Sequence, residues 1–394
     1  MNGILPLLAV TAGVTAANLY YAQPLLADMA RAFDATPGAI GLVTTAAQLG
    51  FATGLLLVTP LADSYDRRRL ILGAATAGML ALIGVGLAPT LPVLLIASYL
   101  LGILTITPQL CVPYAAALAD DRTRGRSVGL VVSGLLVGIL LSRTVSGALG
   151  SRFGWRAPFL VAAAATAVLI VVLARLLQPQ LPPRRVPYRE LLRSLPKIVA
   201  NLPPLRRHAV LGAFAFAAFS VFWTTLPFRL AAPPLHYGSE VAGLFGLLGV
   251  AGAFAAQLAG RLTDRYGSRW VNGGGIAVVA ISYAVLAAAG HTLLGLGLGI
   301  VLLDFGVQGN HVSNQTRILG LDDSLRNRLN TIYMVAFFLG GAVGSAVGSW
   351  SWSRWGWAGV TACGGAFGVA GVIAFGLLPG AAQSRPLVTS ESIS

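Results

Sequence analysis

The sequence predicts an all-α membrane protein with twelve transmembrane helices in two pseudo-symmetric six-helix bundles, and three observations support this class. Of the 394 residues, 56% are apolar and only 10% are charged, whereas about a quarter of a soluble domain is charged. Apolar runs long enough to cross a bilayer, which takes roughly 20 helical residues, recur along the whole chain. The second half of the chain also repeats features of the first.

The apolar runs define twelve predicted spans in order along the chain. They cover residues 4–26, 37–60, 70–89, 91–118, 127–149, 157–177, 208–231, 240–262, 271–290, 292–317, 328–350 and 357–378. Gly and Pro interrupt several of them, which membrane helices tolerate when neighbouring helices re-satisfy the backbone. The first run lacks the basic segment of a signal peptide, so we expect it to remain as a helix.

The arginines predict the orientation, because cytoplasmic loops of membrane proteins are enriched in basic residues. One set of loops contains the segment 175–207 and Arg67, Arg68, Arg69, Arg122, Arg124, Arg126, Arg261, Arg265, Arg269, Arg317, Arg326 and Arg328. The other contains Arg31, Arg152, Arg156, Arg229 and Arg354. Both termini are therefore expected in the cytoplasm. Topology also accounts for the net charge of +14, and no recognition module suggests nucleic-acid binding.

Matching residues at a constant spacing indicate a duplication. Arg124 recurs as Arg326, Gly138 as Gly340 and Gly154 as Gly356, always 202 residues apart. The predicted organisation is a first bundle at 1–177, a cytoplasmic linker at 178–207, a second bundle at 208–378 and a polar tail at 379–394. The middle of the linker is expected to form a short amphipathic helix on the membrane surface.

Two parallel six-helix halves predict a secondary transporter. Such halves place a substrate cavity between them near the midplane, and rocking exposes it to each side in turn. The sequence contains no phosphate-binding G-x-x-x-x-G-K-[ST] loop, His-rich metal motif or G-x-S-x-G elbow. We therefore expect no enzymatic activity, no cofactor and no metal, with gradients as the driving force.

Two short charged loops carry a resemblance to the major facilitator superfamily, which covers essentially the full chain. The family's motif between helices 2 and 3, G-x-x-x-D-R-x-G-x-R, is complete in its second copy, between helices 8 and 9, as Gly260, Asp264, Arg265, Gly267 and Arg269. The first copy keeps Asp63, Arg67 and Arg68 but has Thr59, Ser64 and Asp66 where the family has Gly, Arg and Gly.

The resemblance implies a role for these loops as a conformational latch. In the family the loop aspartate is thought to hold a helix of the opposite half when the cytoplasmic side is closed, so Asp63 is expected to face the start of helix 11 near Arg326. A carboxylate near a helix N-terminus gains about 0.3–1 kcal/mol. The alternative is that these charges only cap helices and fix the topology.

The chain most resembles the twelve-helix drug:proton antiporter branch but departs from it in two helices. In helix 5, Gly129, Gly138 and Gly147 keep the antiporter spacing, whereas the Gly-Pro of the motif is replaced by Ser142-Arg143. Its loss weakens the inference that transport is outward. In helix 4 the family often has an arginine four residues before Gly102, where this chain has Ser98, so another residue must carry protons.

Arg143 is the more informative departure. It lies roughly 24 Å from the cytoplasmic end of its span at 1.5 Å per residue. It is expected either to face the cavity, where it holds a substrate anion or pairs with a carboxylate, or to extend to the outer interface.

Helix 10 contains the strongest candidates for proton coupling. Asp304, Gln308, His311 and Gln315 are spaced to share one helical face. Asp304 lies about 18 Å from the outer end, and a carboxyl at that depth is expected to gain and lose a proton near neutral pH. His311 is expected to titrate there as well. The alternative is structural pairing of Asp304 and simple hydrogen bonding of His311.

The predicted function is proton-coupled export of small organic molecules, with proton symport or uniport for uptake as the alternative. Polar and aromatic residues of the core spans are expected to line the substrate cavity. They are Asn18, Tyr20, Tyr21, Gln23, Gln48, Gln109, Arg143, Trp223, Gln308 and Gln315. The resemblance further implies a monomer in a bacterial inner membrane, with protons and a small molecule as its partners.

Overall fold

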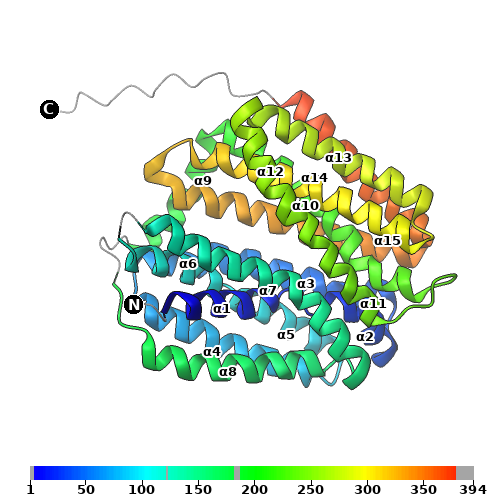
Figure 1. Ribbon diagram of the computed structural model, residues 1–394, viewed down its shortest axis with the longest axis horizontal. Coiled ribbons are helices and arrows are strands. Elements are labelled where there is room, and N and C mark those ends of the chain that lie inside the picture. The colour runs from blue at the N-terminus through cyan, green and yellow to red at the C-terminus, as the bar shows by residue number, and fades with distance from the viewer. Residues whose placement is uncertain (1–3, 121–122, 182–186, 379–394) are drawn as a thin grey trace.

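Figure 1 shows the computed structural model of this chain, in which residues 4–120, 123–181 and 187–378 are described. The side chains of Asp63, Val250, Ala251, Ala253 and Asp323 lie outside this description. So does the predicted tail at 379–394. The described residues form helices and no strands, as predicted.

The helices occur in the order of the predicted spans. The first half contains α1 (Ile4–Ala17), η1 (Gln23–Leu25), α2 (Leu26–Ala32), α3 (Pro37–Leu57), η2 (Thr59–Asp63), α4 (Arg67–Gly86), α5 (Leu91–Leu104), α6 (Thr107–Leu118), α7 (Arg124–Phe153) and α8 (Ala157–Leu176). The linker contains α9 (Tyr188–Asn201). The second half contains α10 (Pro203–Ala231), α11 (Ser239–Leu244), η3 (Phe245–Gly249), α12 (Val250–Tyr266), α13 (Ser268–Ala289), α14 (Leu293–Leu319), η4 (Asp323–Leu325) and α15 (Arg326–Leu377).

Ten helical segments among the described residues are long and apolar enough to cross a membrane. One of them, α15, has 52 residues and joins two helices at Gly356, whose φ of 57° is left-handed. The shorter apolar helix α1 precedes them. These segments correspond to the twelve predicted spans, and they form two helical halves that lie one above the other in Figure 1.

Three predicted spans are broken rather than continuous. The first is interrupted between α1 and η1, where Tyr20 and Gln23 donate their N–H groups to the carbonyls three residues earlier. Pro24, which has no N–H, follows directly. The fourth breaks before Pro108, and the eighth contains the 3₁₀ segment η3. Broken helices at membrane depth are typical of transporter binding sites.

The linker helix α9 forms as predicted, but its apolar face packs against the protein instead of resting on a membrane surface. Leu191, Leu195 and Ile198 are buried, and the Tyr188 hydroxyl donates to the Leu57 carbonyl at 2.7 Å. These apolar residues are covered because α9 lies against η2, α10 and α15. We call the end of the molecule where α9 lies the linker end, and the opposite end the far end.

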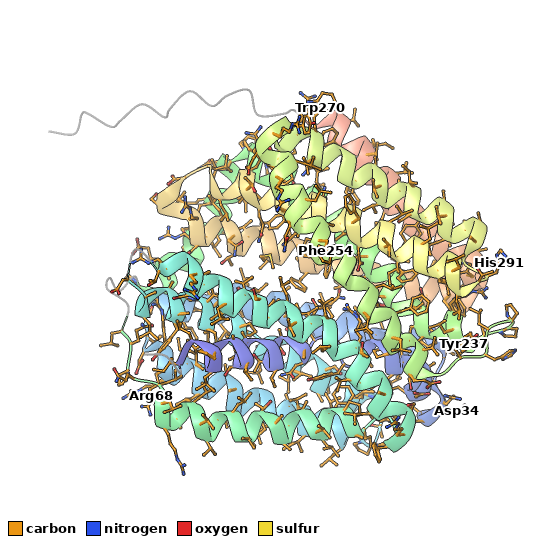
Figure 2. All side chains as sticks on the ribbon, in the orientation of Figure 1. Asp34, Arg68, Tyr237, Phe254, Trp270 and His291 are labelled. Atoms are coloured by element: carbon orange, nitrogen blue, oxygen red, sulfur yellow. The ribbon has the colours of Figure 1, made fainter. Side chains whose placement is uncertain are left out.

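The two halves meet most closely toward the far end, at the right of Figure 1 near α2 and α11. The Gly38 N–H donates to Ser353 Oγ at 2.7 Å, and Thr144 Oγ1 donates to the Gly243 carbonyl at 3.0 Å. Toward the linker end the ribbons of the two halves diverge, and Phe254 points into the region between them (Figure 2). The far end is therefore closed in this conformation.

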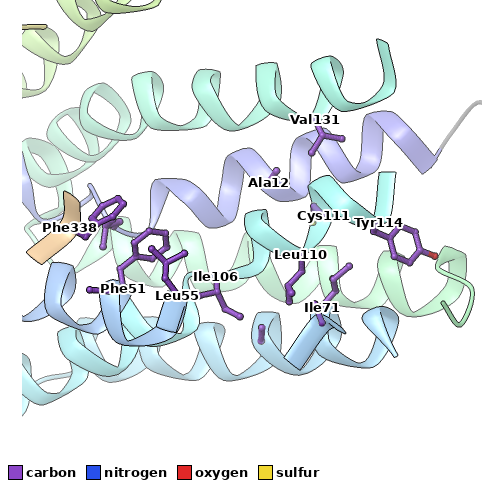
Figure 3. Close-up of a cluster of buried hydrophobic side chains, with 14 of the residues drawn as sticks. Ala12, Phe51, Leu55, Ile71, Ile106, Leu110, Cys111, Tyr114, Val131 and Phe338 are labelled. Atoms are coloured by element: carbon purple, nitrogen blue, oxygen red, sulfur yellow. The ribbon is translucent and has the colours of Figure 1, made fainter. Parts of the chain in front are cut away.

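An aromatic contact joins the halves near the middle of the molecule. Phe51 of α3 and Phe338 of α15 pack edge to face with ring centroids 4.5 Å apart, as Figure 3 shows beside the first-half core. Phe338 also contacts Phe216 of α10. Trp223 lies two turns further along α10 than Phe216, toward the far end.

Candidate functional site

Arg143 lies between the two halves, in the second part of α7. Its side chain is only 3% exposed, and its Nε donates to Gln23 Oε1 at 2.7 Å. Its guanidinium carbon lies 4.7 Å from the centre of the Tyr20 ring and 4.1 Å from that of Trp223, distances at which a cation is attracted to an aromatic face. The side chain thus faces inward, as in the first of its two predicted placements.

Asp304 lies close to Arg143 but comes from the other half. It is 5% exposed, and a Cβ added at Gly249 would lie 3.4 Å from its Oδ2. A Cβ added at Gly246 would lie 3.4 Å from Arg143 Cδ. Both charged side chains therefore pack against the 3₁₀ segment η3, because glycines in it let them approach its backbone.

Several polar atoms of this cluster lack a hydrogen-bond partner although they are buried. They include Arg143 Nη2, Asp304 Oδ1, Trp223 Nε1, Asn18 Oδ1 and Gln48 Oε1. The Trp223 indole N–H lies beside the Asp304 carboxylate without the geometry of a full hydrogen bond. Buried polar groups are normally satisfied, so this cluster has the chemistry to receive a polar molecule that supplies partners of both kinds.

The other predicted cavity residues divide into two groups. Gln48 contacts the opposite half, where its Nε2 donates to Ser220 Oγ at 3.3 Å. Tyr21 instead packs edge to face on Phe159 inside the first half. Gln109 is part-buried on α6, away from the closing contacts. The structure thus brings Tyr20, Gln23, Gln48 and Trp223 to the interface where Arg143 lies, and not Tyr21.

Comparison with known proteins identifies the family. Residues 8–319 match the model of the Major Facilitator Superfamily. The chain belongs to this superfamily. It is 38% identical to the uncharacterized transporter YgaY of Escherichia coli O157:H7, over 92% of each chain. It is 37% identical to the probable transporter SCO4007 of Streptomyces coelicolor, over 95% of this chain and 87% of the relative.

Solved structures of other transporters share the fold. A bacterial homologue of the human lysosomal transporter Spinster, in an inward-facing and occupied conformation, matches with a TM-score of 0.79 at 15% identity, over 95% of each chain. The nucleoside transporter NupG matches with a TM-score of 0.74 at 14% identity, over 95% of this chain and 99% of that one. This superfamily member is a multi-pass membrane transporter, and its relatives and fold are those of transporters rather than enzymes.

The four residues of the predicted proton-coupling face of helix 10 lie on α14, but each contacts a different part of the protein. Gln308 packs beside Gly252 of α12. His311 Nδ1 lies 2.9 Å from the Tyr333 hydroxyl of α15. Gln315 Nε2 donates to Asn330 Oδ1 at 3.3 Å. Asp304 alone of the four lies at the Arg143 cluster, and the others follow in turn toward the linker end.

A buried network that sequence reasoning missed lies behind His311. Asn314 Nδ2 donates to Asn310 Oδ1 at 2.9 Å, and Asn314 Oδ1 lies 2.7 Å from His208 Nδ1. Asn272 of α13 donates to Asn314 and accepts from Asn310. The stretch "GNHVSNQT" could have predicted this network, because amide side chains inside an apolar span need hydrogen-bond partners.

A group of hydroxyls joins the halves beside the cluster. Thr44 Oγ1 of α3 lies 3.3 Å from Thr224 Oγ1 of α10, and Thr224 donates to Ser345 Oγ of α15 at 2.9 Å. These hydroxyls are small and neutral. Their spacing along each helix therefore does not predict that they contact one another.

The predicted latch residues lie at the linker end, where several of them contact neighbouring helix ends. Arg67 and Arg68 contact Gln180 and the Ala174 carbonyl. The side chain of Asp63 lies outside the described residues. In the second half, Arg265 lies over the ring of Tyr266 and Arg326 Nε donates to the Leu319 carbonyl at 3.3 Å.

The remaining latch residues also lie near helix ends. Asp264 and Arg269 lie where α12 ends and α13 begins, on either side of Gly267, whose φ is 85°. In the loop before α15, hydrogen bonds from Ser324 lower the pKa of the exposed Asp322 carboxyl below its usual value. The latch stays a prediction, for a conformation closed at this end.

Proposed function

We propose that this transporter couples the export of small organic molecules to proton entry by alternating access, as in the drug:proton antiporter branch that it resembles. The observation that carries the proposal is the buried pair of opposite charges, Arg143 and Asp304, which come from different halves and meet at a broken helix. Ionisable residues within membrane spans are costly and usually functional. The basic loops support a cytoplasmic linker end and an outward far end, in a bacterial inner membrane, as a monomer.

Attraction between the two charges gives protons a way to control the halves. Arg143 and Asp304 interact electrostatically across the interface. At an effective dielectric constant near 20, such a pair contributes up to about 4 kcal/mol. A proton on Asp304 removes that attraction, so the far end opens more readily when Asp304 is protonated. His311, two turns along the same helix, is the group proposed to pass the proton toward the linker end.

Uptake by symport or uniport is the second candidate. The observation that favours it is the replacement of the Gly-Pro of helix 5 by Ser142-Arg143, which removes the feature associated with export in the family. Symport and antiport use the same acid, so only the relative direction of proton and substrate separates them.

The test uses purified protein in liposomes that contain a pH-sensitive dye. A panel of small organic molecules is added under an imposed pH gradient to wild type and Asp304→Asn. Proton flux that depends on a substrate and disappears in Asp304→Asn supports coupling through Asp304, and its direction distinguishes antiport from symport. Substrate movement without proton flux in the wild type would contradict proton coupling, and flux unchanged in Asp304→Asn would contradict the role of this residue.

A further inference from the structure

The buried cluster offers free hydrogen-bonding atoms of both kinds. Arg143 Nη2 and Trp223 Nε1 are unpartnered donors, and Asp304 Oδ1 is an unpartnered acceptor. All three side chains are at most 5% exposed. These atoms are therefore shielded from bulk solvent in this conformation, and a bound polar molecule that supplies donors and acceptors would satisfy them.

The two charges attract each other but form no direct ion pair. Among the described residues, the pairs with contact between charged atoms are Arg31 with Asp28 and Arg69 with Asp66. Asp304 and Arg143 instead both pack against η3, next to Gly249 and Gly246. Each buried charge retains a desolvation cost that its partner offsets only in part, and a molecule between them with complementary charges would reduce both costs.

We propose that the transported molecule is a small zwitterion, whose carboxylate binds Arg143 and whose ammonium binds Asp304. This inference rests on the proposed function, in which the cluster is the substrate site. It deepens that function by naming the substrate class. Planar bidentate recognition of carboxylates is the chemistry for which arginine is best suited.

The surroundings of the guanidinium favour a carboxylate at its edge. Its Nε is used by Gln23, and the rings of Tyr20 and Trp223 lie over its central carbon. The edge that carries Nη2 remains for a ligand. The same rings supply an apolar wall for the rest of a small molecule.

Singly charged molecules fit this cluster less well. A monoanion would satisfy Arg143 but lie beside the ionised Asp304, and a monocation would have the reverse difficulty with Arg143. A zwitterion places one opposite charge beside each of Arg143 and Asp304, whose own formal charges sum to zero. It also explains exchange with protons, because an ammonium group and a proton both neutralise Asp304 and so exclude each other.

Competition between the ammonium group and a proton for Asp304 predicts how substrate affinity changes with pH. Among the described residues, the charged group that faces Asp304 is Arg143 of α7, and the titratable Tyr20 lies over the guanidinium of Arg143. The other neighbours are Trp223 of α10 and Gly249 and Gly252 of the eighth span, and His311 lies two turns along α14. A zwitterion should bind more weakly as the pH falls and Asp304 takes up a proton, whereas a monoanion should bind more tightly.

The experiment compares molecules that differ only in charge. L-Leucine, L-phenylalanine and L-glutamine are each tested as the free amino acid, the N-acetyl derivative and the methyl ester. Binding to the purified protein is measured by the shift in its unfolding temperature, at pH 5.5 and 7.5. For at least one skeleton we expect the free amino acid to bind about tenfold or more tightly than both derivatives, with weaker binding at pH 5.5.

Variants assign each end of the molecule. Arg143→Gln should remove the preference for the free amino acid over the methyl ester. Asp304→Asn should remove the preference for the free amino acid over the N-acetyl derivative. Arg143→Lys, which keeps the charge, is the second variant if Arg143→Gln does not fold. Thr53→Val is the matched control, since Thr53 contacts Tyr99 and the Leu49 carbonyl inside the first half, and it should bind as the wild type does.

The outcomes separate this inference from the proposed function. Tighter binding of the N-acetyl derivative or the ester, or binding of no skeleton, would overturn the zwitterion. Zwitterion binding without any coupled proton flux in liposomes would support this inference and contradict proton coupling. Proton-coupled transport of a singly charged molecule that requires both Arg143 and Asp304 would support the function and overturn the inference.

Discussion

Arg143 owes its position to neutral and aromatic neighbours rather than to a direct ion pair. Gln23 accepts from its Nε, and Tyr20 and Trp223 cover its guanidinium carbon. Gln23 and Tyr20 belong to the break in the first span. The break in the first span therefore helps to position the Arg143 side chain. From the sequence alone, Arg143 can be placed only within its own helix, α7.

Removing the Gln23 acceptor should impair transport. Gln23→Leu leaves the buried Nε of Arg143 without its partner, and a buried unsatisfied charged group costs about 1–3 kcal/mol. We expect a drop in transport of about tenfold or more, measured in liposomes at matched protein content. The same Thr53→Val control should transport normally. Full activity of Gln23→Leu would mean that Arg143 does not depend on this contact.

Individual site residues could be predicted from the sequence, but their meeting could not. Arg143 and Asp304 are conspicuous because charges are rare inside apolar spans. That they face each other depends on packing between halves that are far apart in the chain. Thr44 and Ser345 were missed because hydroxyls inside a span are common and bond locally to their own helix.

Among the helices, glycines allow α1 and α7 to cross closely. A Cβ added at Gly138 would collide with the backbone of Gly13, and one added at Gly13 would lie 2.6 Å from the Gly134 carbonyl oxygen. Small residues at such crossings let membrane helices approach each other. The α1–α7 contact then fixes where Arg143, further along α7, projects.

Filling this crossing should destabilise the protein. Gly138→Ala is expected to cost about 1–3 kcal/mol by overpacking, seen as a lower unfolding temperature in detergent. Gly129→Ala on the same helix is the matched control, because nothing lies within 4 Å of its added Cβ. Equal unfolding temperatures for the two variants would contradict the close crossing.

The loop between α3 and α4 combines a structural and a proposed functional aspartate. Asp66 is the N-cap of α4, and its Oδ1 accepts from the N–H groups of Arg68 at 3.0 Å and Gln180 at 2.8 Å. Asp66→Ala should therefore lower the free energy of unfolding by about 0.5–2 kcal/mol, as measured by thermal unfolding.

Asp63 should behave differently if it acts as the latch. Asp63→Asn is expected to lower the transport rate in liposomes while leaving expression and the unfolding temperature largely intact, since its contact would form only when the linker end closes. Asp66→Ala serves as the comparison for a loss of stability. An unchanged transport rate in purified Asp63→Asn would remove the latch hypothesis.

The helices themselves were largely predictable because hydropathy is a local property of each segment. The breaks within the helices were less predictable from the sequence. Pro24 marks the first, but η3 has only Gly246 and Gly249 as a signal, and glycines are frequent throughout the spans. The covered apolar face of α9 also depends on tertiary packing, because an amphipathic pattern suits a membrane surface and a protein surface equally.

At the scale of the whole molecule, the halves are joined at the far end through small residues. A Cβ added at Gly38 would lie 3.6 Å from the Ser353 Cβ, and Gly41 packs directly against Ser349. No charges are needed at these contacts, so they can separate at a small cost. Such a surface suits a closure that must open in every transport cycle.

A disulfide should lock this closure. The Cβ separation of 3.6 Å between positions 38 and 353 lies within the range of about 3.5–4.5 Å for disulfides. In a background with Cys111→Ser and Cys363→Ser, we expect oxidised Gly38→Cys/Ser353→Cys to stop transport and a reducing agent to restore it. Each single cysteine variant is the control and should be insensitive to oxidation. Continued transport in the oxidised double variant would contradict opening at the far end.

The central claim is that one buried site between the halves opens to each end in turn. Leu140, one turn before Arg143, lies against Gly249 beside Asp304, so Leu140→Cys places a thiol at that site. The decisive measurement is labelling of this thiol by a membrane-impermeant reagent, added to one side of the membrane at a time, in the background that carries the disulfide pair. We predict labelling only from the linker side while the disulfide is oxidised and from both sides after reduction. Labelling from the far side in the oxidised protein, or from only one side after reduction, would contradict this account.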